Sequence, residues 1–140
     1  FPRPERVTAH MYAGPESEVE DSAAVVVRLE GDRAINLECT WNLLAQRDRQ
    51  YLHLLGSGGS GSLAPLAVFK QMPAGLVEVT PQIPAARENL FTASYRNELS
   101  QFVDVVRGER APDSAREHLV LMRLAEAAYR SATERREIEL

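Results

Sequence analysis

A glycine-rich segment is the part of this 140-residue chain whose residue types suggest chemistry most directly. The run Gly56-Ser57-Gly58-Gly59-Ser60-Gly61 matches the G-x-G-x-x-G spacing of dinucleotide-binding loops and follows a predicted strand. In such loops the last glycine opens a helix whose N-terminus faces the pyrophosphate. Here the residues Ser62-Leu63-Ala64-Pro65 come next, and they favour a strand over a helix. We therefore interpret the segment as a flexible glycine turn between two strands, and we predict no cofactor-binding residue in it.

The other residue types with chemical potential are scattered along the chain. The three histidines have no second ligand at a metal-binding spacing, and no G-x-S-x-G nucleophile motif is present. An acidic run before the first hairpin favours a solvated loop over a metal site. The residues in question are His10, His53 and His118, and the acidic Glu16, Glu18, Glu20 and Asp21. The residues alone therefore predict a domain without a catalytic or metal site of its own.

The composition limits the class of protein. Hydrophobic residues make up 44% and charged residues 26% of the chain, which fits one globular domain over residues 1–140. A net charge of −4 argues against nucleic acid and anionic membranes as partners, and no apolar run is long enough to span a membrane. The single cysteine, Cys39, indicates a reducing, cytoplasmic setting and is predicted to be a small buried residue. Because the chain begins with Phe1 and not Met, we interpret it as a fragment.

The hairpin predicted over residues 22–41 organises the fold. Both arms carry an unbroken apolar row, because side chains alternate across a strand. The two rows coincide only if the connecting loop has an odd number of residues. A loop of residues 30–32 satisfies this condition and pairs Val27 with Ile35 and Val25 with Leu37.

The remaining pattern places strands first and helices last. Strands are predicted over residues 6–13, 50–55, 63–69, 75–79 and 137–140, and residues 42–49 are predicted to be a loop. Apolar spacing predicts helices over residues 89–107 and 114–135, the second with a capping box between Ser114 and Glu117. This order predicts an α+β fold, a predominantly antiparallel open sheet with two C-terminal helices packed on one face.

The opposite face of the sheet, here called the open face, has no helix left to cover it. It is too apolar to be plainly exposed to solvent, so we expect a second copy of the chain to cover it and form a homo-oligomer, a dimer in the simplest case. Its predicted residues are Thr8, Tyr12, Ala24, Val26 and Thr40, with Tyr51 as a further candidate.

Taken together, these segments resemble a known family. VEDSAAVVVRLEGDRAINLECTW, LHLLGSGGSGSL, YRNELSQFVDVVRGERAP and DSAREHLVLMRLAEAAYRSATERREIEL follow one another as in the C-terminal domain of Gfo/Idh/MocA (glucose–fructose oxidoreductase and inositol dehydrogenase type) NAD(P)-dependent oxidoreductases. The most specific positions are Tyr95, Glu98, Leu99, Phe102, Gly108, Ala127, Tyr129, Arg130 and Ser131.

The resemblance implies a division of labour. An N-terminal Rossmann domain, absent from this chain, would hold NAD or NADP and carry the family's catalytic residues, so none is assigned here and the isolated fragment is expected to be inactive and to bind no cofactor. The chain would supply the subunit interface and a substrate wall for a sugar, a polyol or a related small hydroxy compound. Asn42, Gln46 and Arg47 are the candidate substrate-binding residues, because the loop after Trp41 points toward the shared cleft in relatives. The alternative is a stand-alone oligomerisation or ligand-binding module without redox activity.

Overall fold

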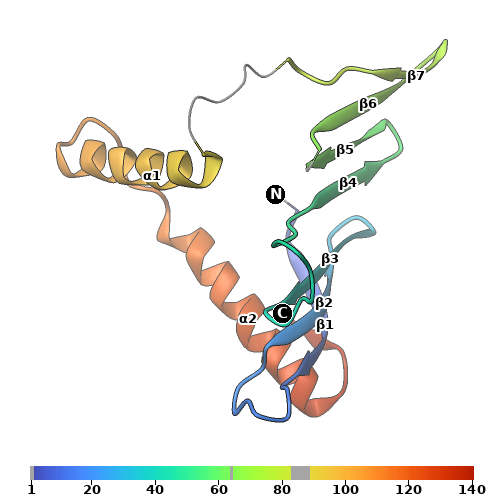
Figure 1. The fold of residues 1–140 in the computed structure, drawn as a ribbon, viewed down its shortest axis with the longest axis vertical. Helices are drawn as coiled ribbons and strands as arrows, with labels where there is room; N and C mark the ends of the chain where they lie inside the picture. The colour runs from blue at the N-terminus through green and yellow to red at the C-terminus, as the bar shows by residue number, and fades with distance from the viewer. Residues whose placement is uncertain (1, 64, 83–88) are drawn as a thin grey trace. The chain divides into compact units, whose positions relative to one another are not determined.

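The structure of the chain is a computed structural model that describes residues 2–63, 65–82 and 89–140. The chain forms two compact units (Figure 1). The first contains residues 1–44 and 112–140, so the two ends of the sequence fold together. The second contains residues 45–111.

The first unit is built on a four-stranded antiparallel sheet. Its strand order is β3-β2-β1-β8, with β1 at Pro4–Tyr12, β2 at Ser22–Leu29, β3 at Arg33–Thr40 and β8 at Ile138–Glu139. Val27 faces Ile35 and Val25 faces Leu37, which confirms the predicted register and the three-residue loop between β2 and β3. In this loop Gly31 has a φ of 77° and Asp32 a φ of 55°, the left-handed values that a tight turn of this length requires.

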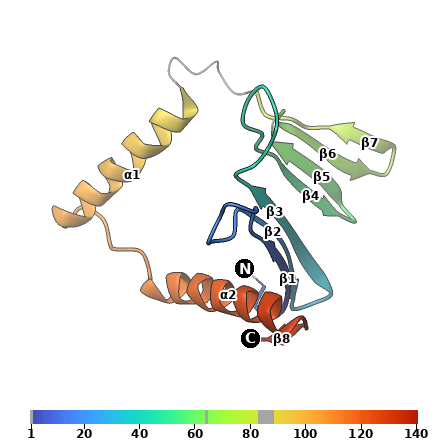
Figure 2. The same cartoon turned by 60° about the horizontal axis from the view of Figure 1, so that its bottom comes forward.

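One long helix, α2 (Ala115–Glu134), covers one face of this sheet (Figure 2). The helix begins at Ser114, whose hydroxyl accepts the backbone N–H of Arg116 at 3.3 Å and so confirms the predicted N-cap. The reciprocal contact was predicted for the side chain of Glu117, which is not among the side chains that the structure describes. The helix ends at Arg135, whose φ of 54° turns the chain back toward β8.

The core of the first unit lies between α2 and the inner two strands. Alternate residues of β1 and β2 point toward the helix, where two alanines allow the backbones to approach closely. Among the side chains that the structure describes, the buried hydrophobic ones there are Val7, Ala9, Val27, Leu29, Ala127, Ala128 and Ile138. The predicted apolar row of the hairpin therefore forms the core on β2.

On β3, the residues of the predicted apolar row lie outside the core. Ile35 and Leu37 are 41% and 55% exposed, and Cys39 is exposed as well. The prediction that Cys39 is buried is therefore wrong for this unit. The physical reason is the strand order, because α2 packs against β1 and β8, and β3 lies at the opposite edge of the sheet.

The second unit contains an antiparallel meander and a helix. Its strands are β4 (Leu52–Gly56), β5 (Gly59–Leu63), β6 (Ala67–Met72) and β7 (Gly75–Glu78), in the order β4-β5-β6-β7. The strand predicted over residues 63–69 begins later than expected, because the chain turns at Pro65, whose carbonyl accepts the Ser62 hydroxyl at 3.1 Å. Helix α1 (Leu90–Val106) begins at Asn89, whose side chain accepts the N–H of Phe91 at 2.8 Å.

Together these elements confirm the α+β class and the antiparallel strands. The strands are divided between two sheets of four. The last predicted strand does return to the sheet edge, where Val7 of β1 pairs with Ile138 of β8. Tyr51, predicted for the open face, lies in the second unit, just before β4.

Candidate functional site

The glycine-rich segment is part of a sheet. The turn is confined to Ser57 and Gly58, and from Gly59 the chain runs as β5, paired with β4 on one side and β6 on the other. A Cβ added to Gly59 would lie 2.2 Å from the carbonyl oxygen of Phe69, so glycine is needed for this close approach. Because the backbone of β5 is used in the sheet and no helix follows, the segment lacks the geometry of a phosphate-binding loop.

The three predicted substrate-binding residues follow β3 in a stretch without regular secondary structure. All three are exposed. Asn42 belongs to the first unit and lies directly beyond the end of β3, whereas Gln46 and Arg47 belong to the second unit. Of the three, Asn42 has a defined role in the first unit, because its side chain enters a hydrogen-bond network.

That network is centred on Asp21 at one end of the sheet. The carboxylate oxygen Oδ2 of Asp21 accepts the N–H of Gly14 at 2.9 Å and the side-chain amide of Asn42 at 2.5 Å. The other oxygen, Oδ1, accepts the Ser22 hydroxyl at 2.9 Å. The Ser22 hydroxyl also lies 2.8 Å from Oγ1 of Thr40, which accepts the backbone N–H of Asn42 at 3.0 Å. These five residues are called the Asp21 network below.

The hydrogen bonds stabilise the charged form of the carboxylate. The Gly14 N–H contributes most, followed by the Ser22 hydroxyl, and the Asn42 amide adds to both, so the pKa of Asp21 is lowered from its usual value. Partial burial opposes this shift but does not cancel it. Asp21 is therefore ionised throughout the neutral range.

The acidic run that contains Asp21 was predicted to be a solvated loop, and this is only half right. Glu16 and Glu18 are exposed, but Glu20 and Asp21 are half-buried. The hydroxyl of Tyr129 on α2 donates to the Glu20 carboxylate. The available signal was the hairpin register, because pairing Ser22 with Thr40 places Asp21 beside the chain that leaves β3.

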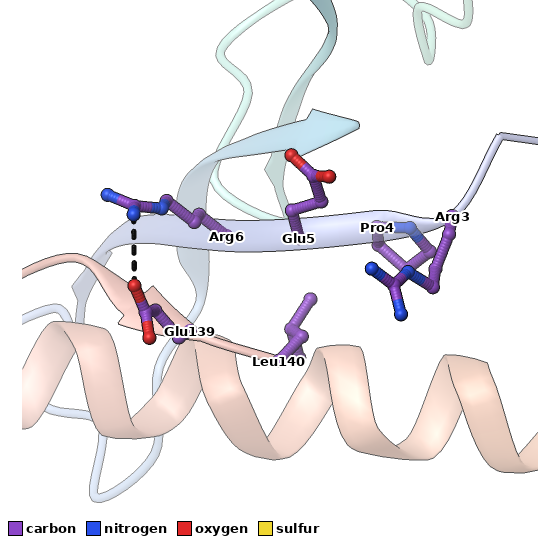
Figure 3. Close-up of a pocket in the computed structure, with 6 residues that line it drawn as sticks. All are labelled: Arg3, Pro4, Glu5, Arg6, Glu139 and Leu140. Atoms are coloured by element: carbon purple, nitrogen blue, oxygen red, sulfur yellow. Dashed lines mark hydrogen bonds and ion pairs between the residues drawn. The ribbon is translucent and has the colours of Figure 1, made fainter. Parts of the chain in front are cut away.

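A second polar cluster lies where β1 meets β8. Arg6 donates to Glu137 at 3.0 Å and to Glu139 at 2.9 Å, and the hydrogen bond to Glu137 is the main reason that the pKa of Arg6 is raised. An open pocket of about 300 Å³ borders this cluster (Figure 3). It is lined by Arg3, Pro4, Glu5, Arg6, Glu139 and Leu140. Arg6 is already paired with two carboxylates. We therefore interpret the cluster as a contact that holds the C-terminal strand β8 against β1, and not as a binding site for anions.

The histidines are spread over separate elements. His10 lies on β1, His53 on β4 and His118 on α2. Within residues 2–63, 65–82 and 89–140 no group of three or more His, Cys, Asp or Glu side chains could hold a metal ion. Among the helices of the described part, none has both the length and the apolar character of a membrane span.

Several known structures share the fold of this chain. An oxidoreductase domain protein from Kribbella flavida has a TM-score of 0.77 at 18% identity, with 99% of this chain and 44% of that chain covered. Levoglucosan dehydrogenase, solved with NADH and L-sorbose, has a TM-score of 0.76 at 16% identity, with 98% and 44% covered. Aldose-aldose oxidoreductase from Caulobacter crescentus, solved with glycerol, has a TM-score of 0.69 at 20% identity, with 99% and 42% covered.

At these identities the structural likeness shows a shared fold, and the chain spans less than half the length of each of these structures. A search of curated protein sequences gave no match. The sequence model of one family, described as "Oxidoreductase family, C-terminal alpha/beta domain", matches residues 1–140. This chain therefore belongs to the Gfo/Idh/MocA oxidoreductase family and corresponds to its C-terminal alpha/beta domain.

Proposed function

We propose that these 140 residues are the C-terminal domain of a longer NAD(P)-dependent oxidoreductase that acts on a sugar, a polyol or a related small hydroxy compound. The observation that carries the proposal is the family match over residues 1–140. The proposed cofactor, NAD or NADP, is supported by levoglucosan dehydrogenase, which was solved with NADH. In this proposal an N-terminal Rossmann domain binds the cofactor and supplies the acid or base that moves the substrate proton.

The chain would contribute a wall of the substrate site. Residues 42–49 connect β3 to β4 and carry an amide at Gln46 and a guanidinium at Arg47, both exposed. An amide suits hydroxyl groups, and a guanidinium can bind a carboxylate through two parallel hydrogen bonds. We assign the substrate contacts to Gln46 and Arg47, with the free Oδ1 of Asn42 as a further acceptor.

The chain would also contribute the contact between subunits. On the open face, Thr8 lies opposite Val26 and Tyr12 opposite Ser22, on the side of the sheet away from α2. Tyr12 is 61% exposed and Val26 42% exposed. We propose that a second copy covers this face, because one apolar sheet face can bury itself against the same face of a symmetry-related copy.

A cytoplasmic location stays a prediction from the single cysteine.

Turnover by the whole protein tests this function. The full-length protein is incubated with NAD⁺ or NADP⁺ and a panel of sugars and polyols, and NAD(P)H formation is followed by absorbance. We expect turnover with members of this panel, and none from residues 1–140 alone. Arg47→Ala should raise KM for the active substrate about tenfold or more, since a charge-assisted contact is lost. A full-length protein that turns over no panel member with either cofactor would favour the stand-alone module.

A further inference from the structure

Asp21 lies where three strands of the first unit end. Tyr12 is the last residue of β1, Ser22 the first of β2 and Thr40 the last of β3. The backbone of Asp21 joins the ends of β1 and β3, the two neighbours of β2, because its N–H donates to the Tyr12 carbonyl at 3.0 Å and its carbonyl accepts the Trp41 N–H at 2.8 Å. Asp21 is thus held on both sides by backbone hydrogen bonds, and these bonds fix the point from which its side chain extends.

The side chain fills a position that only an acceptor can occupy. All three neighbours of the carboxylate are donors: the Gly14 N–H, the Ser22 hydroxyl and the Asn42 amide. Hydrogen bonds to an ionised acceptor are shorter and stronger than neutral ones. Gly14 leaves the room for this contact, since a Cβ added there would lie 2.9 Å from the carboxylate oxygen Oδ2.

The network holds Asn42 in two places. Its backbone N–H donates to Thr40 Oγ1 at 3.0 Å, and its side-chain amide donates to Asp21 at 2.5 Å. Fixing both groups holds Asn42 just beyond the end of β3. Of the three proposed substrate contacts, Asn42 is the one that lies in the first unit.

We infer that Asp21 is a positioning residue for Asn42 and leaves the Oδ1 of Asn42 as the acceptor offered to substrate. Asn42 then serves the Asp21 network with its amide N–H group and the substrate with its Oδ1. This inference rests on the proposed function, because that function makes Asn42 part of a substrate wall. Asp21 itself touches no substrate.

Asp21→Asn is the test substitution, because asparagine keeps the shape and replaces one acceptor with an NH₂ group that faces donors. In the full-length protein, hydrogen exchange at the Trp41 and Asn42 backbone amides should become about tenfold faster as the local opening equilibrium shifts. KM should rise about fivefold while kcat changes less than about twofold. Glu18→Gln is the matched control, an exposed carboxylate of the same loop, and should change neither quantity.

A reciprocal pair separates positioning from a general loss of stability. The double variant Asp21→Asn with Asn42→Asp restores a donor and an acceptor between the two positions with their roles exchanged. It should recover most of the protection from hydrogen exchange at Trp41, and its KM should return most of the way to the wild-type value. If protection at Trp41 stays lost, the contact between positions 21 and 42 is not the link, and the inference is wrong.

The outcomes also separate this inference from the proposed function. If Arg47→Ala raises KM and Asp21→Asn leaves KM unchanged, the substrate wall stands and the positioning role of Asp21 is overturned. If Asp21→Asn speeds exchange but neither Gln46→Ala nor Arg47→Ala changes KM, the proposed substrate wall fails and the positioning role fails with it. Unchanged exchange at Trp41 and Asn42 in Asp21→Asn contradicts the inference directly.

Discussion

The hydroxyl of Ser131 on α2 accepts the backbone N–H of Ala9 on β1 at 2.9 Å, and both residues are buried. The same hydroxyl donates to the carbonyl of Arg136 at 2.7 Å, where the chain turns from α2 toward β8. One side chain therefore joins the helix, the inner strand and the C-terminal turn. Because Ser131 is 1% and Ala9 2% exposed, water has no access to replace the bond between them.

Ser131→Ala should leave the buried N–H of Ala9 and the part-buried carbonyl of Arg136 without this partner. Each unsatisfied group costs about 1–3 kcal/mol, so the free energy of unfolding should fall by about 2 kcal/mol or more. Urea unfolding followed by circular dichroism measures the change. Thr133→Ala, at an exposed position of the same helix, is the control and should alter the stability by less than about 0.5 kcal/mol. Equal stability of Ser131→Ala and wild type would mean that the hydroxyl does not hold α2 to β1.

The short strand β8 should contribute to stability beyond its length. Ile138 is 2% exposed and belongs to the core with Val7. Ile138→Val should cost about 0.5–1.5 kcal/mol and Ile138→Ala about 2–5 kcal/mol, because the second leaves the larger cavity. Leu140→Ala, which truncates a side chain that is 46% exposed, should cost much less. Thermal unfolding of the three variants gives the order, and an equal loss for Ile138→Ala and Leu140→Ala would contradict the core assignment.

The glycine-rich segment offers a matched pair of substitutions. At Gly59 an added Cβ would meet the Phe69 carbonyl, and the φ of 154° is one that other residues rarely adopt. At Gly58 an added Cβ would have no neighbour within 4 Å. Gly59→Ala should therefore disrupt the pairing of β5 with β6 and speed hydrogen exchange in both strands. Gly58→Ala should leave exchange there close to wild type, and the reverse order would mean that β5 is not where the structure places it.

The Asp21 network should make the free energy of unfolding depend on pH in the acidic range. The pKa of Asp21 is lowered in the folded chain, mainly by the Gly14 N–H, from an ordinary value of about 3.9. A lowered carboxyl pKa stabilises the fold above the unfolded pKa, and this contribution is lost as pH falls through the folded pKa. The stability difference between wild type and Asp21→Asn should be constant above about pH 5 and shrink below about pH 4. Urea unfolding between these limits tests this, and a difference that grows toward low pH would have the wrong sign.

Local patterns predicted local structure well, because they depend on short-range physics. The odd-length loop between Val27 and Ile35 followed from alternation alone, and the N-cap at Ser114 followed from the capping-box pattern Ser-Ala-Arg-Glu. Hydrogen bonds between residues far apart in the sequence could not be predicted from such local patterns. Nothing in the sequence pairs Ser131 with Ala9, since serine also occurs freely on exposed helix faces.

The candidate site shows the same limit. Asn42, Gln46 and Arg47 were chosen because a family resemblance pointed to their loop, and neither periodicity nor composition marks them. The role of Asp21 was missed because an acidic run is usually a solvated loop, and that expectation does hold for Glu16 and Glu18. Burial of Cys39 was predicted from alternation, which gives the face of a strand but not how far a helix reaches across the sheet.

Calorimetric titration of NADH and NADPH is the most direct test of the central claim, that this chain is the C-terminal domain of a nicotinamide-dependent oxidoreductase. It should be run in parallel on the full-length protein and on residues 1–140. We predict saturable binding of one cofactor per subunit to the full-length protein and no binding heat with residues 1–140 alone. Binding to residues 1–140, or no binding of either cofactor to the full-length protein, would contradict the claim.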